Sequence, residues 1–262
     1  MGSESLTPKD RSIGVLAAVH SEISPLIKRR ARRARPGGDN FSSWEGSLNG
    51  SKLLLVLTGM GKRRAEEAAR IVLERSPLSM LLSVGFCGAL SADLRVGDLV
   101  LCQRLVSYDG DPRSASVISD PGLVQAFLRL DTRNKAIIAG TSLVVDRIIR
   151  LPEEKKSLRA STGADVIDME SYWIGQICKQ KGIPFLALRA VSDQADDLLP
   201  DLGDAVDQPG SMEWAAAWSL LRHPGEWGRL LHFIQNMGAA RRSLNQFLDE
   251  FIGNYRSEVR TG

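Results

Sequence analysis

The stretch from Asp165 to Pro200 constrains the fold of this chain more than any other part of the sequence. It opens with a short apolar run, and residues 169–182 then show helical spacing that ends at Gly182 and Pro184. Residues 183–191 form a continuous apolar run, as in a strand that is covered on both faces. The stretch therefore predicts a strand, a helix and a second strand, which is typical of an α/β protein.

Polar residues gather where these two predicted strands end. Asp168 and Glu170 follow the first strand, and Arg189, Ser192 and Asp193 lie toward the end of the second. In open α/β sheets, ligands bind in the crevice beyond the carboxyl ends of the strands. We therefore expect the two clusters to face one crevice.

The remaining elements are predicted from apolar runs and from turn residues. We expect strands at residues 12–19, 41–48, 52–58, 78–84, 96–101 and 135–142, and helices at residues 63–75, 121–130, 211–222, 224–236 and 239–252. Residues 20–24 are expected to form a turn before a helix with Pro25 near its first position, and Asn49-Gly50 a hairpin turn.

Length and composition favour one folded unit. A chain of 262 residues, 43% apolar and 25% charged, can bury a sizeable core within a single α/β domain. We expect residues 1–11 to form a disordered tail and residues 12–200 the main domain. Residues 201–262 are expected to form a helical extension packed on that domain.

Charge and cysteine usage argue against several classes of protein. A net charge of +3 gives no argument for nucleic-acid binding. Cys87, Cys102 and Cys178 lack the spacing of a zinc site or a disulfide framework, as expected of reduced thiols in a cytoplasmic protein. No apolar run approaches about 18 residues and no signal peptide is evident. We expect no metal and no cofactor.

Four motifs carry a resemblance to a known family. The residues D-M-E-S from Asp168 and R-A-V-S-D from Arg189 follow T-G-M-G-K from Thr58 and V-G-D-L-V from Val96. Together they resemble the nucleoside phosphorylase and nucleosidase superfamily, in the branch that includes methylthioadenosine/S-adenosylhomocysteine nucleosidases. The resemblance implies a three-layer α/β/α fold with a central mixed, twisted sheet, followed here by the C-terminal helical extension.

The resemblance also implies the catalytic roles. Asp193 would protonate the departing purine, while Glu22 and Arg189 would hold the attacking water. Glu170 would bind the ribose hydroxyls, with Met169 packed against the sugar. The charged residues also have structural explanations. Glu22 and Glu170 could be acids in the first turns of helices, and Arg189 and Asp193 could form a salt bridge at the end of the strand.

The base-binding side is implied in the same way. Ile148, Ile149, Ser192 and Asp193 would contact the purine. The family often has an aromatic residue in the place of Ile148, so plain core packing of both isoleucines remains an alternative.

Gly85, Phe86, Cys87 and Gly88 form the loop that lies on the water or phosphate side in the family. Phe86 stands where the family has a hydroxyl residue. A benzyl group neither donates nor accepts a hydrogen bond, which weakens phosphate binding and favours hydrolysis. Cys87 as a nucleophile would need a partnered histidine, so we expect a buried, inert thiol.

These observations predict a nucleosidase that cleaves the N-ribosidic bond of a 5′-substituted purine nucleoside and releases the free base, adenine being expected. One alternative is a phosphate-dependent phosphorylase, although the family's G-D-P-x-R loop does not follow the first strand. The other is a nucleoside-binding protein without turnover. A small nucleoside and copies of the same chain, as a homodimer or higher oligomer, are the expected partners, with no nucleic acid.

The C-terminal region is similar to a subgroup associated with hopanoid lipid synthesis, which implies an adenosyl-lipid substrate. The alternative for its amphipathic helices is a cap on the sheet or a dimer interface. Its apolar helical residues include Trp214, Trp218, Trp227, Leu231 and Ile234. The basic run at residues 28–35 is typical of a solvated helix end, and could instead place a cytoplasmic protein against the anionic inner membrane.

Overall fold

The computed structural model describes residues 12–34, 41–48, 50–108, 115–129, 137–201 and 227–259. For residues 33, 34 and 253–259 it describes the backbone alone. Asn49, residues 1–11 and residues 202–226, with the expected helix at residues 211–222 and with Trp214 and Trp218, lie outside this part of the chain.

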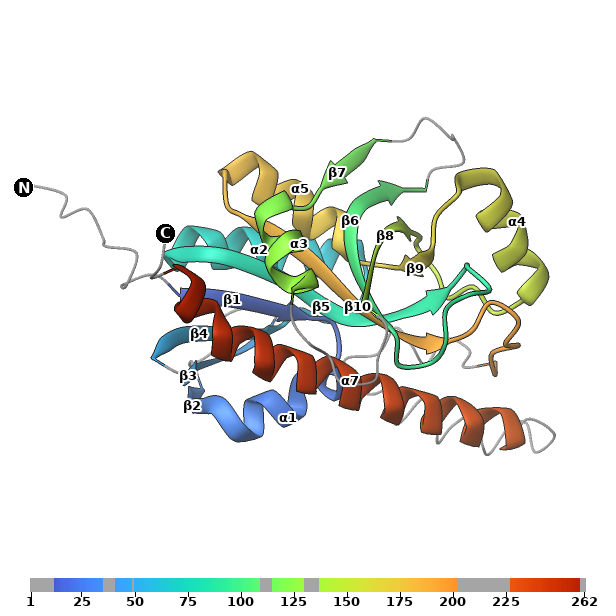
Figure 1. Ribbon diagram of the computed structural model, residues 1–262, viewed down its shortest axis with the longest axis horizontal. Coiled ribbons are helices and arrows are strands. Elements are labelled where there is room, and N and C mark those ends of the chain that lie inside the picture. Colours follow the sequence, from blue (N-terminus) through green and yellow to red (C-terminus); the bar gives the residue numbers. More distant parts are fainter. Residues whose placement is uncertain are drawn as a thin grey trace, which may run out of the picture.

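Strands, singly or in runs of three, are separated by helices along the described chain (Figure 1). The strands are β1 (Ser12–Ala17), β2 (Ala31–Ala34), β3 (Ser42–Leu48), β4 (Ser51–Leu57), β5 (Leu78–Ala89), β6 (Leu99–Ser107), β7 (Ser116–Ile118), β8 (Ile137–Val144), β9 (Val166–Asp168) and β10 (Phe185–Asp193). The helices are α1 (His20–Arg30), α2 (Lys62–Arg75), α3 (Pro121–Leu128), α4 (Pro152–Thr162), α5 (Ser171–Lys181) and α7 (Trp227–Val259).

All ten strands belong to one mixed sheet. Its order is β10-β6-β8-β9-β5-β1-β4-β3-β2, with β7 paired to β6, and β10 also pairs with β5. The pairings from β5 through β9, β8, β6 and β10 back to β5 therefore close into a ring, while β1 to β4 extend the sheet on one side. The α/β prediction with a central mixed sheet is confirmed.

Helices cover both faces of the sheet, because successive apolar side chains of a strand point to opposite faces and are buried on both. Ile13, Val15 and Ala17 of β1 point to the face covered by α1, α3 and α7, whereas Leu16 points to the face covered by α2 and α5. Figure 1 shows α7 running beside α1 along one side of the sheet. The strand expected at residues 183–191 is β10. It is buried at every position from Phe185 to Asp193, as its continuous apolar run predicts.

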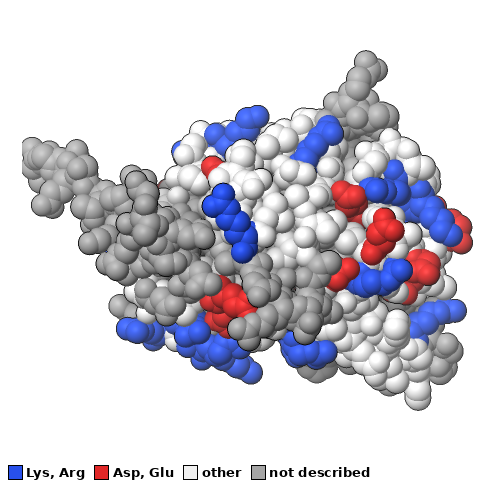
Figure 2. Space-filling model, in the orientation of Figure 1, with Lys and Arg blue, Asp and Glu red and all other residues white. Residues whose placement is uncertain are grey.

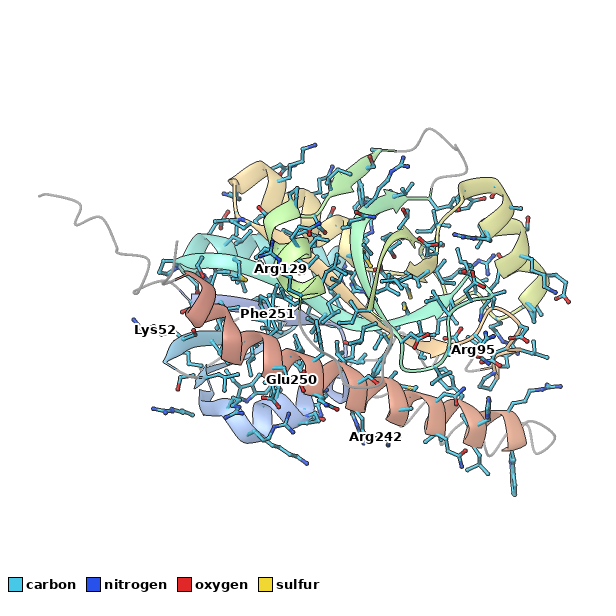
Figure 3. All side chains as sticks on the ribbon, viewed as in Figure 1. Lys52, Arg95, Arg129, Arg242, Glu250 and Phe251 are labelled. Atoms are coloured by element: carbon cyan, nitrogen blue, oxygen red, sulfur yellow. The ribbon has the colours of Figure 1, made fainter. Side chains whose placement is uncertain are left out.

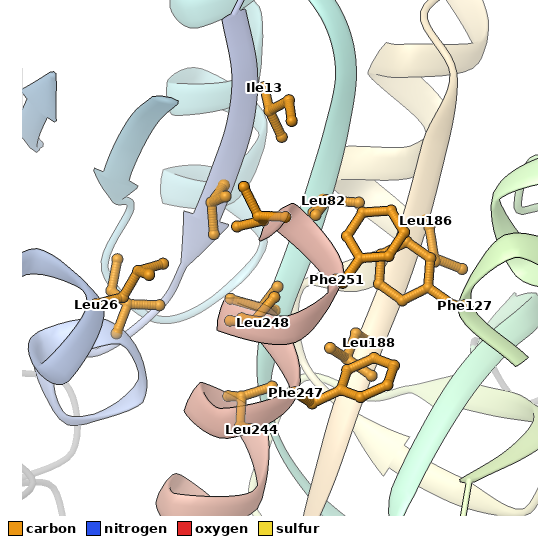
Figure 4. Close-up of a cluster of buried hydrophobic side chains, with 14 of the residues drawn as sticks. Ile13, Leu26, Leu82, Phe127, Leu186, Leu188, Leu244, Phe247, Leu248 and Phe251 are labelled. Atoms are coloured by element: carbon orange, nitrogen blue, oxygen red, sulfur yellow. The ribbon is translucent and has the colours of Figure 1, made fainter. Parts of the chain in front are cut away.

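Aromatic rings join α3 and α7 to the sheet. Phe127 of α3 stacks on Phe251 of α7 with ring centroids 3.3 Å apart, and both lie over Leu186 of β10 (Figure 4). Figure 3 shows Phe251 on the side of α7 that faces the sheet and Arg242 on the opposite side. This packing fixes the C-terminal part of α7 over the amino end of β10, so the earlier residues of the same helix extend toward the carboxyl end, where the polar clusters lie.

Three local predictions are wrong. The turn expected at residues 20–24 is the first part of α1, with Pro25 inside the helix, because the Glu22 side chain caps the preceding backbone N–H groups. The strand expected to end at Val84 continues as β5 through Ala89, since β10 pairs with residues 81–88 and β9 with Gly88 and Ala89.

The helices expected at residues 224–236 and 239–252 are one helix, α7. A break near Gly238 does not form, because a helix-interior glycine costs only about 1 kcal/mol. Packing of Ala240, Leu244 and Leu248 into the core outweighs that cost.

The basic run ends α1 and enters the edge strand β2. Lys28 and Arg29 are exposed, and Figure 2 shows basic side chains gathered at the lower left, where Figure 1 places α1. Arg29 and Arg30 both form ion pairs with Asp249 of α7. Within the described ranges, no helix has the length and apolar character needed to cross a bilayer.

Candidate active site

A cavity of about 720 Å³, part of it open to solvent, lies where β5, β9 and β10 end. Its described lining residues are Ala18, Val19, Glu22, Met60, Phe86, Cys87, Gly88, Val145, Arg147, Ile148, Ile149, Ile167, Asp168, Met169, Glu170, Ser192, Asp193, Leu199, Phe233 and Met237. The two polar clusters, which are separated by α5 in the sequence, thus meet at one pocket.

Glu22 is held by backbone N–H groups from two elements. Its Oε2 accepts from Ala18 at 2.8 Å and Val19 at 2.9 Å, and its Oε1 accepts from Phe86 of β5 at 2.9 Å. Burial raises the pKa of Glu22, although these N–H groups and Arg189 oppose the rise. The carboxyl group is therefore fixed in place and can carry a proton at a higher pH than an exposed glutamate.

The α7 helix supports Glu22 from the other side. Buried Asn245 donates from Nδ2 to the Glu22 carbonyl oxygen at 2.7 Å. No motif in the sequence pointed to Asn245. A polar residue on the buried face of α7, between Leu244 and Phe247, is the signal that could have found it.

Glu170 meets the glycine loop between β4 and α2. Its Oε1 accepts from the Gly61 N–H at 2.7 Å, and Gly61 has a φ of 89°, which favours glycine. Burial raises the pKa of Glu170 to about 8, with smaller upward contributions from Asp168 and Glu22. The T-G-M-G-K loop therefore places a backbone N–H donor against the Glu170 carboxyl group, which is largely protonated at neutral pH.

Asp168 organises the start of α5. Its carboxylate accepts from the N–H of Glu170 and of Ser171, and from the hydroxyls of Ser142 and Ser171 at 2.5 and 2.6 Å. Burial would raise the pKa of Asp168, but Arg189 and these donors hold it below its usual range. Asp168 is therefore ionised, in contrast to Glu170 two positions later.

Arg189 lies beneath the pocket, in a smaller cavity of about 230 Å³ that it shares with Glu22, Glu170 and Gly85. It is 2% exposed and donates to the Ser83 carbonyl and hydroxyl oxygens, both at 2.9 Å. Its ion-pair partner is Asp168, 3.5 Å away. The alternative in which Arg189 pairs with Asp193 is therefore wrong.

Asp193 pairs instead with Lys155 of α4. Lys155 Nζ donates to Asp193 Oδ2 at 2.6 Å, and the Ser192 hydroxyl donates to Asp193 Oδ1 at 2.7 Å. Burial raises the pKa of Asp193, Lys155 and Ser192 oppose the rise, and Asp197 adds to it. No motif in the sequence pointed to Lys155, although its three-residue spacing from Leu158 on the buried face of α4 is a signal that could have found it.

Most of the remaining wall is apolar. Ile148, Ile149 and Met169 line it from the loops that follow β8 and β9, and Phe233 and Met237 line it from α7. Cys87 also lines the pocket, and burial raises the pKa of its thiol far above the usual range. The site can thus surround a partly apolar molecule with carboxyl groups at fixed positions.

Comparison with known proteins identifies the family. The profile described as "Phosphorylase superfamily" matches residues 12–219. The chain belongs to the phosphorylase superfamily. That match spans most of the chain and includes every residue of both polar clusters.

Individual relatives of this phosphorylase-superfamily chain are distant. The 5′-methylthioadenosine/S-adenosylhomocysteine nucleosidase of Anoxybacillus flavithermus is 27% identical over 199 residues, which are 70% of this chain and 86% of that protein. The corresponding nucleosidase of Haemophilus ducreyi is 27% identical over 70% of this chain and 85% of that protein.

Solved structures show the same fold. The nucleosidase of Neisseria meningitidis, in complex with methylthio-immucillin-A, superposes with a TM-score of 0.73 at 23% identity, over 93% of this chain and 99% of that chain. Futalosine hydrolase of Helicobacter pylori superposes with a TM-score of 0.74 at 19% identity, over 94% and 99%.

The structure places the predicted residues of this superfamily member in two adjoining cavities. Gly85 and Arg189 line only the smaller one, and Glu22, Phe86 and Glu170 line both. The larger pocket takes the other predicted residues, which are Cys87, Gly88, Ile148, Ile149, Met169, Ser192 and Asp193.

Trp227, Leu231 and Ile234, the described members of the apolar set predicted in the C-terminal region, are not among the residues that line the pocket. Trp227, Leu231 and Ile234 are 52%, 57% and 46% exposed, because the face of α7 toward the site carries Phe233 and Met237. These two residues are four positions apart and therefore lie on one side of the helix. Among the described residues, no group of three or more His, Cys, Asp or Glu side chains could hold a metal ion.

Proposed function

We propose that this protein hydrolyses the N-ribosidic bond of a 5′-substituted purine nucleoside, with adenine as the expected base. The observation that carries the proposal is the arrangement of acids: Asp193 lines the large pocket, while Glu22 and Glu170 line both that pocket and the small cavity beneath it. Asp193 has a raised pKa, as a proton donor at neutral pH requires.

The proposed reaction passes through an oxocarbenium-like sugar, as in other glycoside cleavage. Asp193 gives its proton to the departing purine, whose ring stacks against Ile148 and Ile149, with Ser192 beside it. A water in the small cavity, oriented by Glu22 and Arg189, attacks the anomeric carbon. Its proton passes to Glu22 as the new C–O bond forms.

The ribose in this scheme lies between the two cavities. Glu170 accepts hydrogen bonds from the ribose hydroxyls, and Met169 packs against the sugar ring. The Gly61 N–H on Glu170 Oε1 fixes the direction in which that carboxyl group points.

Hydrolysis is favoured over phosphorolysis by the small cavity. Two carboxyl groups line this cavity. Arg189 already donates to Ser83 and to Asp168, so these N–H groups are not available to bind a phosphate. Phe86 supplies only its backbone N–H there, and that N–H donates to Glu22. A phosphate would have to draw Arg189 away from Ser83 and Asp168, and the Phe86 N–H away from Glu22.

The finer substrate choice concerns the 5′ substituent. Phe233, Met237 and Leu199 favour an apolar group, and an adenosyl-lipid of hopanoid synthesis is the specific candidate that the C-terminal resemblance suggests. If the substrate is such a lipid, Lys28 and Arg29 would also contact the surface of an anionic membrane. The Asp249 ion pairs would weaken that contact, and the homo-oligomer stays a prediction.

Purified protein should be incubated with 5′-methylthioadenosine, S-adenosylhomocysteine and a long-chain 5′-alkylthioadenosine, with and without phosphate. Free adenine and free sugar are expected at the same rate in both buffers, with the alkyl compound preferred in kcat/KM. Strict phosphate dependence with a sugar 1-phosphate product would establish phosphorolysis instead. Tight nucleoside binding without base release would establish a binding protein.

A further inference from the structure

A lysine side chain is enclosed at the edge of the site. Lys155 is 0% exposed, and it is the charged member of the otherwise apolar buried face of α4. Burying an ammonium group is costly unless it is paired and hydrogen-bonded. Lys155 meets that condition through Asp193 Oδ2 at 2.6 Å and the Gln194 carbonyl oxygen at 2.7 Å.

These contacts hold one end of the Asp193 side chain. Oδ2 binds Lys155, and Oδ1 binds the Ser192 hydroxyl, so both oxygens have fixed partners. Gly88 closes the remaining side, because a Cβ there would stand 2.9 Å from Oδ2. Asp193 lines the pocket, whereas Lys155 is not among its described lining residues.

We propose that Lys155 is a positioning residue for the reaction at this pocket, with its ammonium group holding the Asp193 carboxyl group in the orientation that faces the substrate. The inference rests on the proposed function and deepens it. Lys155 itself touches no substrate and acts through Asp193.

The pair also has a pH signature. The charged or titratable groups that act on Asp193 are Lys155 of α4, Asp197 after β10, and Cys87 of β5, whose buried thiol is neutral. Lys155 lowers the pKa of Asp193, and Asp197 raises it. If Asp193 is the proton donor, activity falls as pH rises through its pKa, and removing Lys155 moves that limb to higher pH.

The test compares Lys155→Met with Lys156→Met, in which the neighbouring exposed lysine is changed in the same helix. Lys155→Met is expected to lower kcat by roughly 10- to 100-fold, since a misplacement of about 1 Å costs that much. The basic limb of its kcat profile should move up by about one pH unit or more. Lys156→Met is expected to match the wild type in both.

An unmoved limb, or a kcat equal to that of Lys156→Met, overturns the proposal, because a purely structural lysine would change only the melting temperature. Failure of the proposed function is recognised separately, by absence of base release from the wild type or by full activity of Asp193→Asn.

If Lys155→Met does not fold, Lys155→Met is combined with Asp193→Asn, which replaces the buried ion pair by neutral side chains. The double variant is then compared with Asp193→Asn alone. Equal residual kcat supports action through Asp193, and a further fall of about 10-fold overturns it.

Discussion

Gly85→Ala perturbs the candidate site through a single added carbon atom. A Cβ at Gly85 would lie 2.5 Å from Glu22 Oε1 and 3.1 Å from its Cδ. The neighbouring backbone of β5 is paired to β10, so the glutamate side chain must move instead. Moving it breaks the 2.9 Å hydrogen bond from the Phe86 N–H.

The expected cost follows from that bond. A hydrogen bond to a charged group contributes about 1.5–3 kcal/mol, while alanine in a strand is about 0.5–1 kcal/mol better than glycine. The net loss of about 0.5–2.5 kcal/mol should lower the melting temperature by a few degrees, since about 2–4 °C corresponds to each kcal/mol in a chain of this size. The kcat for base release should fall by about 10²-fold if Glu22 orients the attacking water as proposed, because its carboxyl group would then be displaced.

Calorimetry and an adenine-release assay measure the two effects. Gly14→Ala, in β1, is the matched control. Its Cβ would lie 2.7 Å from Leu78 Cδ1, which strains the core without touching Glu22. That variant should lose stability and keep its kcat. Glu22→Gln combined with Gly85→Ala should be no slower than Glu22→Gln alone. Full activity of Gly85→Ala, or additive losses in the double variant, would refute the reasoning.

Two further predictions concern the other acids. Asp193→Asn should reduce kcat by about 10²–10⁴, and should lower the melting temperature because Lys155 loses its counter-charge; an unchanged rate excludes Asp193 as the proton donor. For Glu170, whose pKa rises from 4.5 to about 8, the stabilisation is complete below pH 4.5 and is lost as pH rises toward 8. The unfolding free energy of the wild type relative to Glu170→Gln should therefore fall by a few kcal/mol between pH 5 and pH 8, at about 1.4 kcal/mol per pKa unit, and a difference that does not vary with pH would contradict the burial of this acid.

The sequence alone determined the parts of this protein that depend on local pattern. The apolar run that became β10 predicts burial on both faces, and the helical spacing after Asp168 predicts α5 with its end near Gly182. The predicted strands that became β9 and β10 are both followed by or end in polar residues. The pattern therefore also predicts that Glu170 and Asp193 face the same crevice. Such signals work because strand and helix periodicity, and helix termination, act within a few residues.

Only the tertiary structure decided which distant groups complete the site. Lys155 reaches Asp193 from another helix, Asn245 reaches the Glu22 carbonyl across 223 positions, and Phe233 and Met237 reach the pocket from α7. The extension of β5 past Val84 likewise depends on pairing with β10 and β9. These contacts follow from the register of paired strands and from the rotation of packed helices, and neither is written in the local pattern that specifies each element.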